Sequence, residues 1–200
     1  IMNGVIEYLI SDDEGAEFLR NTFVFKIIPM LNPDGVIVGN YRCSLVGQDL
    51  NRQWVGPSSK LYPENYHTKL MMRKTLESRD IFFFCDFHGH STNRNVFMFG
   101  NNQQKQPDRL KEKIFPMLFS ENNENFSLDE CNFAVQKSRE STARVVMWRE
   151  FNLIHSYTLE CSFCGPTKGI YAGCHFNTTL MLVIGRVFCK TLRDLVDNEQ

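Results

Sequence analysis

The sequence predicts an α/β layered fold, and three observations support this prediction. Apolar runs rich in β-branched and aromatic residues, which are typical of buried strands, occur at residues 23–28, 81–85 and 154–163. Segments with helical spacing of apolar residues alternate with these runs, as in folds where helices pack on a sheet. The chain has 200 residues, 42% hydrophobic and 22% charged, which excludes fibrous and disordered proteins. We therefore expect residues 1–200 to form one domain or a large part of one.

The N-terminal part of the chain predicts two helices, a strand and two irregular segments. Residues 1–10 have helical spacing, and no capping residue stands before them. We therefore expect a helix whose preceding residues, including its N-terminal cap, are missing. A short helix ending at Leu19 precedes the strand at residues 23–28, which we expect to be buried. The Asn-Pro-Asp-Gly sequence at residues 32–35 predicts a turn. The long polar segment at residues 39–57 is typical of a functional loop.

The rest of the chain continues the alternation. The strand at residues 81–85 is apolar on both faces, as expected inside a sheet, and a second long strand is expected at residues 154–163. A short strand is expected at residues 96–99. Helices are expected at residues 64–79, 108–119, 142–151 and 177–196, the last of them amphipathic.

The charge balance and the cysteines restrict the class of protein. With 22 basic and 23 acidic residues the net charge is −1, so the sequence predicts neither a nucleic-acid partner nor a membrane partner. No apolar run approaches the roughly 18 residues of a membrane-spanning helix. The seven cysteines are odd in number and lack a framework spacing, which favours a reducing, intracellular compartment. The single Cys-x-x-Cys pair, at residues 161–164, is weak evidence for a zinc or redox site.

Three polar clusters lie at the ends of predicted strands or in adjoining loops, at residues 42–52, residues 86–90 and Glu160. Ligands of α/β sheets bind at the carboxyl ends of strands, so we expect these clusters to share one pocket. Glu160 follows an apolar strand pattern, where a carboxylate without a partner is destabilising. Either a salt bridge to a buried arginine or a role as general base near a metal-bound water accounts for this position.

The second cluster contains Asp86, His88 and His90, which have the same parity along their strand. Their side chains are therefore expected on one face of the sheet. This arrangement suits a carboxylate that orients a metal-binding histidine, or a pair of histidine ligands. A hydrogen-bonded His88 without a metal fits the same pattern, so the residues alone leave these alternatives open.

The third cluster contains Arg42, Asn51 and Arg52 in the long polar loop. A planar guanidinium beside an amide suits bidentate binding of a carboxylate. A solvated loop with charged side chains fits the same pattern, and both interpretations stay open at this level.

Five motifs occur in order along the chain. They are Asn-Pro-Asp-Gly at residues 32–35, Gly-Asn-Tyr-Arg-Cys-Ser at 39–44, Asp-Leu-Asn-Arg-Gln-Trp at 49–54, Asp-Phe-His-Gly-His-Ser at 86–91 and Ser-Tyr-Thr-Leu-Glu at 156–160. Together they resemble the cytosolic carboxypeptidases, zinc metallocarboxypeptidases that remove glutamates from tubulin and other proteins. The resemblance covers nearly the whole chain and implies a zinc-carboxypeptidase fold, with a mixed twisted sheet flanked by helices.

The resemblance implies a role for each matching residue. His88 is the implied Zn2+ ligand, and Glu160 is the implied general base and acid. Arg42 polarises the scissile carbonyl and stabilises its oxyanion in this scheme. Asn51 and Arg52 hold the terminal carboxylate of the substrate.

A further segment bears on the substrate. Residues 137–146, Lys-Ser-Arg-Glu-Ser-Thr-Ala-Arg-Val-Val, are most similar to family members that shorten polyglutamate chains. Arg144 in this segment matches the basic residue that faces a glutamate side chain in the specificity pocket. The implied partners are polyglutamylated protein tails, with tubulin as the leading example. The implied location is the cytoplasm, including association with microtubules.

The sequence departs from the family pattern in one respect. The family's other two zinc ligands come from a His-Pro-Gly-Glu motif upstream of the first helix, and this motif does not occur in residues 1–200. The N-terminal β-rich domain of cytosolic members is also missing from these residues. A catalytic zinc needs three protein ligands. We therefore expect a catalytic-domain fragment, truncated on its N-terminal side, that has no peptidase activity alone.

Two other functions are consistent with the residues. A non-catalytic binder of acidic protein tails would use Asn51 and Arg52 without hydrolysing the bound chain. A self-contained metal site formed by His88, His90 and Glu160 would bind zinc within this chain and point to a hydrolase of another class.

Overall fold

The computed structural model describes residues 1–103 and 108–199. Within these residues the strands form a three-stranded sheet in which β3 (His155–Ser162) lies between β1 (Phe83–His90) and β2 (Val96–Phe99). β1 is parallel to β3, and β2 is antiparallel to it. The sheet is therefore mixed, and the α/β class is confirmed. No described strand pairs with the other edge of β1.

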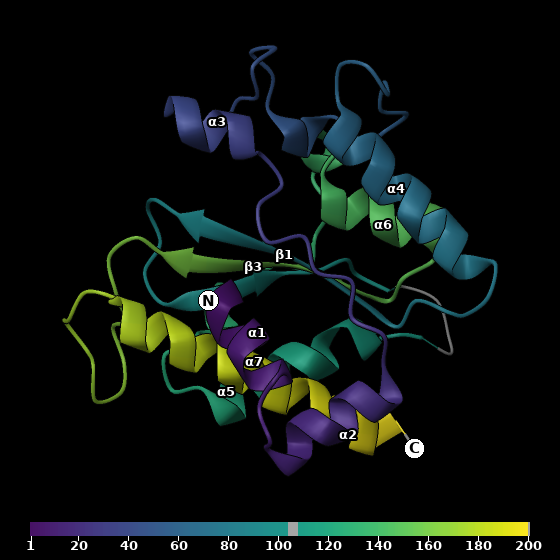
Figure 1. The fold of residues 1–200 in the computed structure, drawn as a ribbon. Coiled ribbons are helices and arrows are strands. Elements are labelled where there is room, and N and C mark those ends of the chain that lie inside the picture. The colour runs from purple at the N-terminus through teal and green to yellow at the C-terminus, as the bar shows by residue number, and fades with distance from the viewer. Residues whose placement is uncertain (104–107, 200) are drawn as a thin grey trace.

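Helices cover both faces of this sheet (Figure 1). Outside residues 23–35, the order of the elements agrees with the alternation expected from the sequence, and the helix bounds differ from the expected ones by a few residues. One face carries α1 (Met2–Leu9), α2 (Glu14–Thr22), α5 (Ile114–Asn122) and α7 (Thr178–Glu199). The other carries α4 (Pro63–Leu76) and α6 (Ala143–Phe151), with α3 (Pro33–Val38) beside them. No helix in the described ranges is long and apolar enough to cross a bilayer.

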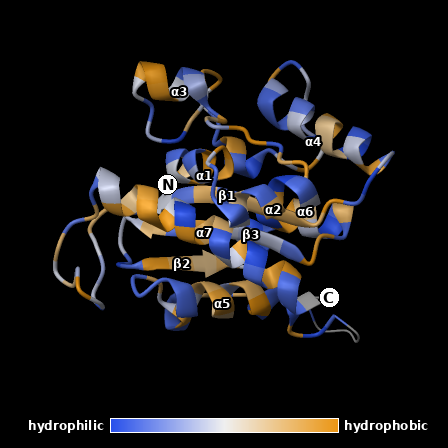
Figure 2. Ribbon diagram, turned by 60° about the horizontal axis from the view of Figure 1, so that its bottom comes forward, coloured by the Kyte–Doolittle hydropathy of each residue, from blue (hydrophilic) through white to orange (hydrophobic). Residues whose placement is uncertain are grey.

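The core consists of two apolar clusters, one on each face of the sheet. The larger cluster lies between the sheet and α1, α5 and α7, and includes the fully buried Phe115, Tyr157 and Leu159. Figure 2 shows β2 and α5 largely in the hydrophobic colour, as their place in this cluster requires. A side chain at Gly4 of α1 would collide with the backbone of Leu182 in α7, so these two helices pack in close contact.

The smaller cluster lies under α4 and α6. It contains Trp54, Met72 and Met147, with Phe84 of β1 packed against them. The side chain of Lys69 is also buried here, where its Nζ donates to the backbone oxygen of Trp54 at 2.8 Å and pairs with Glu150 at 2.7 Å. These contacts hold the end of the polar loop against α4 and α6.

The predicted turn at residues 32–35 is wrong, because this sequence begins the short helix α3. Asn32 caps the helix by accepting a hydrogen bond from the backbone N–H of Gly35, and Pro33 occupies the first helical position. Both residues start helices as readily as turns. Gly39, with φ of 88°, ends the helix in the left-handed conformation.

The predicted buried strand at residues 23–28 is also wrong. The segment has no regular secondary structure and is not paired with any described strand. Val24 is 55% exposed and Ile28 39% exposed. The β-branched and aromatic composition favours an extended backbone, but a strand also needs a neighbouring edge with which to form hydrogen bonds.

Candidate functional site

The site lies where β1 and β3 run side by side, and it pairs a histidine with a glutamate. The strand register places His88 directly opposite Glu160. His88 Nδ1 lies 3.6 Å from Glu160 Oε1. Glu160 is 7% exposed, and its Oε2 is buried without a hydrogen-bond partner in the described part of the chain. A buried carboxylate with a free oxygen therefore faces the imidazole, and the salt bridge to a buried arginine is not present among the described residues.

The environment of Glu160 favours its protonated form. Burial raises the pKa of Glu160, and the positive charge on His88 only partly opposes this effect. Asp86 raises the pKa further, while Arg42 and Arg139 lower it. A carboxylate with a raised pKa is a stronger proton acceptor than an exposed one, which suits a general base.

Asp86 fixes the orientation of His88. Its Oδ2 lies 2.7 Å from His88 Nε2, so the other ring nitrogen is turned toward Glu160. Burial lowers the pKa of His88, but the hydrogen bond to Asp86 and the charges of Asp86 and Glu160 outweigh it, so the pKa is raised overall. A carboxylate that holds one ring nitrogen is the usual partner of a metal-binding histidine.

His90 does not join this arrangement. Its Nδ1 accepts a hydrogen bond from the backbone N–H of Asn93 at 3.0 Å, and its ring packs edge-on against Phe97. The described residues contain no group of three histidine, cysteine or acidic side chains placed to hold a metal ion. The hypothesis of a self-contained site formed by His88, His90 and Glu160 is therefore wrong. The prediction that Asp86, His88 and His90 share one face of β1 was right. However, the bend after the strand occupies the His90 Nδ1 with a hydrogen bond.

The polar loop brings the arginines to the same region through Asp49. Asp49 caps the short 3-10 helix Leu50–Arg52 by accepting a hydrogen bond from the Asn51 N–H at 2.9 Å. Its other oxygen lies 2.9 Å from Arg42 Nε and 3.8 Å from Arg52 Nη1. Asp49 thus positions both arginines, a role that the sequence prediction missed. An Asp two residues before the Asn-Arg pair was the available signal, because Asp commonly caps such turns.

Asn51 joins the loop to both the sheet and α6. Its Nδ2 lies 3.5 Å from His88 Nε2, and its Oδ1 accepts a hydrogen bond from the Ala143 N–H at 2.9 Å. The neighbouring Leu50 backbone oxygen accepts a hydrogen bond from the buried Asn65 of α4 at 2.8 Å. The three clusters predicted to share one pocket therefore lie together.

Arg144 lies deeper than the other arginines. It is 6% exposed, and its Nη1 donates to Asn101 Oδ1 at 2.8 Å and to the Gly100 oxygen. Burial lowers the pKa of Arg144 to about 10, so it remains charged at neutral pH. Arg139, which the sequence prediction gave no role, is close enough for its charge to lower the pKa values of Arg144, Arg52 and Glu160. The site is therefore basic, with arginines around the buried carboxylate of Glu160.

The donors present here do not complete a catalytic zinc centre. Such a centre has three protein ligands and one open position. The described residues offer the His88 ring nitrogen, with Glu160 as its acidic neighbour, and no third ligand. The role of His88 as a zinc ligand therefore stays a prediction.

Comparison with known proteins finds relatives of one kind, the carboxypeptidases. The family described as zinc carboxypeptidase matches residues 1–170. Cytosolic carboxypeptidase 2 from Mus musculus is 46% identical over 201 residues, which cover 100% of this chain and 23% of the relative. Cytosolic carboxypeptidase 3 from Bos taurus is 44% identical over 203 residues, which cover 100% of this chain and 20% of the relative.

A solved structure shows the same fold. The metallo-carboxypeptidase from Pseudomonas aeruginosa, in complex with (2-guanidinoethylmercapto)succinic acid, matches with a TM-score of 0.80 and 25% identity. The match covers 100% of this chain and 53% of that chain. The chain thus spans about half of the solved structure and less than a quarter of the two cytosolic relatives.

Proposed function

Because the chain belongs to the zinc carboxypeptidase family, whose members are metallocarboxypeptidases and hence hydrolases, we propose that it supplies one half of a deglutamylase active site. The proposed reaction is removal of glutamates from the C-termini or side-chain polyglutamates of proteins. The observation that carries this proposal is the convergence of His88, Glu160 and Asn51 from three separate segments.

Glu160 is the proposed general base and acid. Its free Oε2 accepts a proton from the attacking water and later returns it to the departing glutamate nitrogen. Burial, which raises the pKa of this carboxyl, makes it suited to both steps. No described group donates a hydrogen bond to this oxygen.

His88 is the proposed ligand of the zinc that the family description names. Asp86 holds one ring nitrogen and thereby presents the other. The described residues contain no further ligands for this ion, so His88 contributes to a zinc centre that these residues do not complete.

Substrate binding is assigned to the arginines. Asn51 and Arg52 hold the terminal carboxylate, since an amide beside a guanidinium matches its two oxygens. Arg42, held by Asp49, polarises the scissile carbonyl and stabilises the developing oxyanion. Arg144 faces the glutamate side chain through the donors that Asn101 and Gly100 do not use, because a guanidinium has five N–H donors.

Polyglutamylated protein tails, above all those of tubulin, are the proposed substrates, and the cytoplasm with its microtubules is the proposed location. The word "cytosolic" in the relatives' names supports the compartment. The basic surroundings of Arg52, Arg139 and Arg144 support an acidic substrate.

A non-catalytic binder of acidic tails is the second candidate. One observation favours it: the described residues lack a three-ligand metal group, whereas a binder of acidic tails needs only the proposed carboxylate-binding residues Asn51 and Arg52. This candidate predicts that acidic tails bind without being cut.

The test uses a chimera in which this chain replaces the matched region of mouse cytosolic carboxypeptidase 2. We expect the chimera to release glutamate from a polyglutamate-ended peptide, and Glu160→Gln to lower the rate by about 100- to 10,000-fold with zinc content and peptide binding retained. Glu7→Gln, at an exposed position on α1, is the matched control and should keep full activity. Binding without release by the unmodified chimera would favour the binder, and full activity in Glu160→Gln would reject its role.

A further inference from the structure

The loop that joins β3 to α7, residues 163–177, carries two cysteines on its surface (Figure 1). Cys164 lies near the start of this loop and Cys174 near its end, and both thiols are free and exposed. The other cysteines of the chain are half-buried or buried. Cys161, the other member of the Cys-x-x-Cys pair, is among the buried ones. A redox partner for Cys164 therefore has to come from elsewhere, and Cys174 is the exposed thiol in the same loop.

The two ends of the loop are in direct backbone contact beside these cysteines. The backbone N–H of Phe176 donates to the oxygen of Cys164 at 2.8 Å. Gly165 lies against the backbone of Cys174, so closely that a Cβ built on Gly165 would lie 1.8 Å from the Cys174 oxygen. Because Cys164 directly precedes Gly165, the Cα atoms of the two cysteines lie within about 10 Å of each other.

This separation is close to the geometry of a disulfide, which places the two Cα atoms about 4.4–6.8 Å apart. A movement of at most about 3 Å therefore brings the cysteines into bonding range. The loop can make this movement, because residues 167–175 are all exposed and contain neither helix nor strand. The buried residues Gly165, Pro166 and Phe176 hold its two ends together meanwhile.

We propose that Cys164 and Cys174 form a reversible disulfide when the protein meets hydrogen peroxide. One thiolate attacks a peroxide oxygen, which breaks the O–O bond, gives a sulfenic acid and releases hydroxide. The second thiolate attacks the sulfenic sulfur, forms the S–S bond and releases hydroxide again. The protons lost by the two thiols convert both hydroxides to water. The thiols are thus oxidised, the peroxide is reduced, and no further reactant is needed.

The bond restrains the chain that leaves the strand of Glu160. The first loop residue, Phe163, donates its backbone N–H to the His90 oxygen at 3.0 Å. Its ring lies against Gly89, where a Cβ would stand 2.1 Å from a ring carbon. Oxidation therefore tightens a segment beside the candidate site, and the inference does not depend on a catalytic role of Glu160. In a reducing compartment such a bond is transient, as is typical of redox-responsive pairs.

The test treats the 200-residue chain with hydrogen peroxide and maps disulfides by mass spectrometry of an unreduced tryptic digest. Trypsin cleaves after Lys168, between the two cysteines, so their peptides stay joined only through the disulfide. Fragmentation of the joined peptides distinguishes Cys164 from Cys161. We expect the bond on Cys164 and Cys174, and hydrogen exchange at residues 167–175 slower by about tenfold or more. Dithiothreitol should reverse both changes.

Cys164→Ser and Cys174→Ser should each abolish the joined peptides and the slower exchange. Cys43→Ser, at a half-buried cysteine outside the loop, is the matched control and should leave both unchanged. These exposed substitutions keep the fold, so each variant reports on the bond itself.

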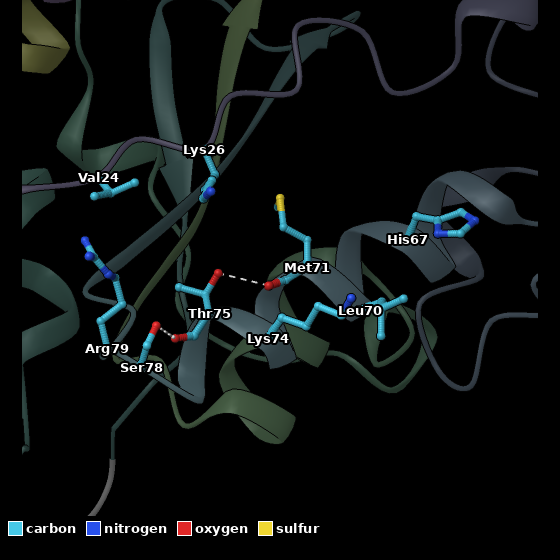
Figure 3. Close-up of a pocket in the computed structure, with 9 residues that line it drawn as sticks. All are labelled: Val24, Lys26, His67, Leu70, Met71, Lys74, Thr75, Ser78 and Arg79. Carbon is cyan, nitrogen blue, oxygen red and sulfur yellow. Dashed lines mark hydrogen bonds between the residues drawn. The ribbon is translucent and has the colours of Figure 1, made fainter.

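Methionine oxidation gives an internal measure of the peroxide dose. Met71 lines a pocket between α4 and the segment that carries Val24 and Lys26 (Figure 3), so peroxide reaches its thioether and forms the sulfoxide. Dithiothreitol should leave this sulfoxide in place while it restores the two thiols. Two outcomes overturn the inference: no bond between Cys164 and Cys174 when Met71 is oxidised, or a bond that joins two copies of the chain on a non-reducing gel.

Discussion

Two segments of this chain, residues 23–28 and β3, have the same strand-like composition but differ in strand pairing and in burial. All of β3 is buried, with Tyr157 and Leu159 completely inaccessible. Residues 23–28 remain unpaired, and Val24 is 55% exposed. β3 has a strand on each side, whereas residues 23–28 have none in the described structure.

The difference teaches that composition determines whether a segment is extended, and that neighbouring strands determine whether it is buried. β3 even buries Ser156, Thr158 and Glu160, because its two neighbours and the flanking helices leave little of their surface exposed to solvent. The candidate site depends on this burial, since the raised pKa of Glu160 comes first from burial. Substitutions in paired and unpaired segments should therefore differ in their effects.

The largest effect is expected for truncation in the paired strand. Leu159→Ala should lower the free energy of unfolding by about 2–5 kcal/mol, because it leaves a cavity in the larger apolar cluster. Val24→Ala in the unpaired segment should change it by less than about 0.5 kcal/mol. Urea unfolding followed by circular dichroism measures the stability of both variants. Equal losses would contradict the predicted difference between the paired and the unpaired segment.

The next effect concerns two cysteines on either side of the end of β3. Cys161 is buried in the strand, and burial raises its pKa to about 11. Cys164 lies just beyond the strand and is exposed. Iodoacetamide at pH 8 should therefore modify Cys164 at least about 100-fold faster than Cys161.

Mass spectrometry of the digested protein measures the two alkylation rates. The rate at Cys161 should rise as the pH approaches 11, because its thiolate becomes populated there. In concentrated urea the two rates should become similar, which serves as the control. Similar rates in the folded protein would show that the end of β3 is open to solvent.

A smaller effect of opposite sign is expected at Glu160. Glu160→Met removes a buried carboxylate whose Oε2 has no described partner, so the free energy of unfolding should rise by about 1 kcal/mol. Glu140→Met, at an exposed glutamate paired with Arg149, should produce no such gain. A large loss of stability in Glu160→Met would mean that this carboxylate is held by favourable contacts and is not strained for function.

Much of the architecture and of the site was predictable from local patterns. The period-two parity of β1 placed Asp86 and His88 on one face, and the rule for strand ends brought Glu160 to the same place. The predicted roles of all the site residues, including Glu160, His88 and the arginines, stay predictions, because geometry alone does not assign a function to a side chain.

The remaining features depended on contacts between distant residues. The ends of the helices, the separate use of His90 by Asn93 and the position of Asp49 between two arginines are set by tertiary neighbours. The missing pairing of residues 23–28 is of the same kind, since a local pattern carries no information about which edge is available.

The smallest effect is expected in α3, which belongs to neither apolar cluster. Asn32→Ala removes the cap on Gly35 and a hydrogen bond to the Cys43 oxygen at 3.2 Å. The cap is worth about 1 kcal/mol locally, so amide exchange at Gly35 and Val36 should accelerate several-fold. Because α3 unfolds without disturbing either cluster, the global free energy of unfolding should change by less than about 0.5 kcal/mol. A global loss near that of Leu159→Ala would show that α3 and the loop after it are coupled to the core.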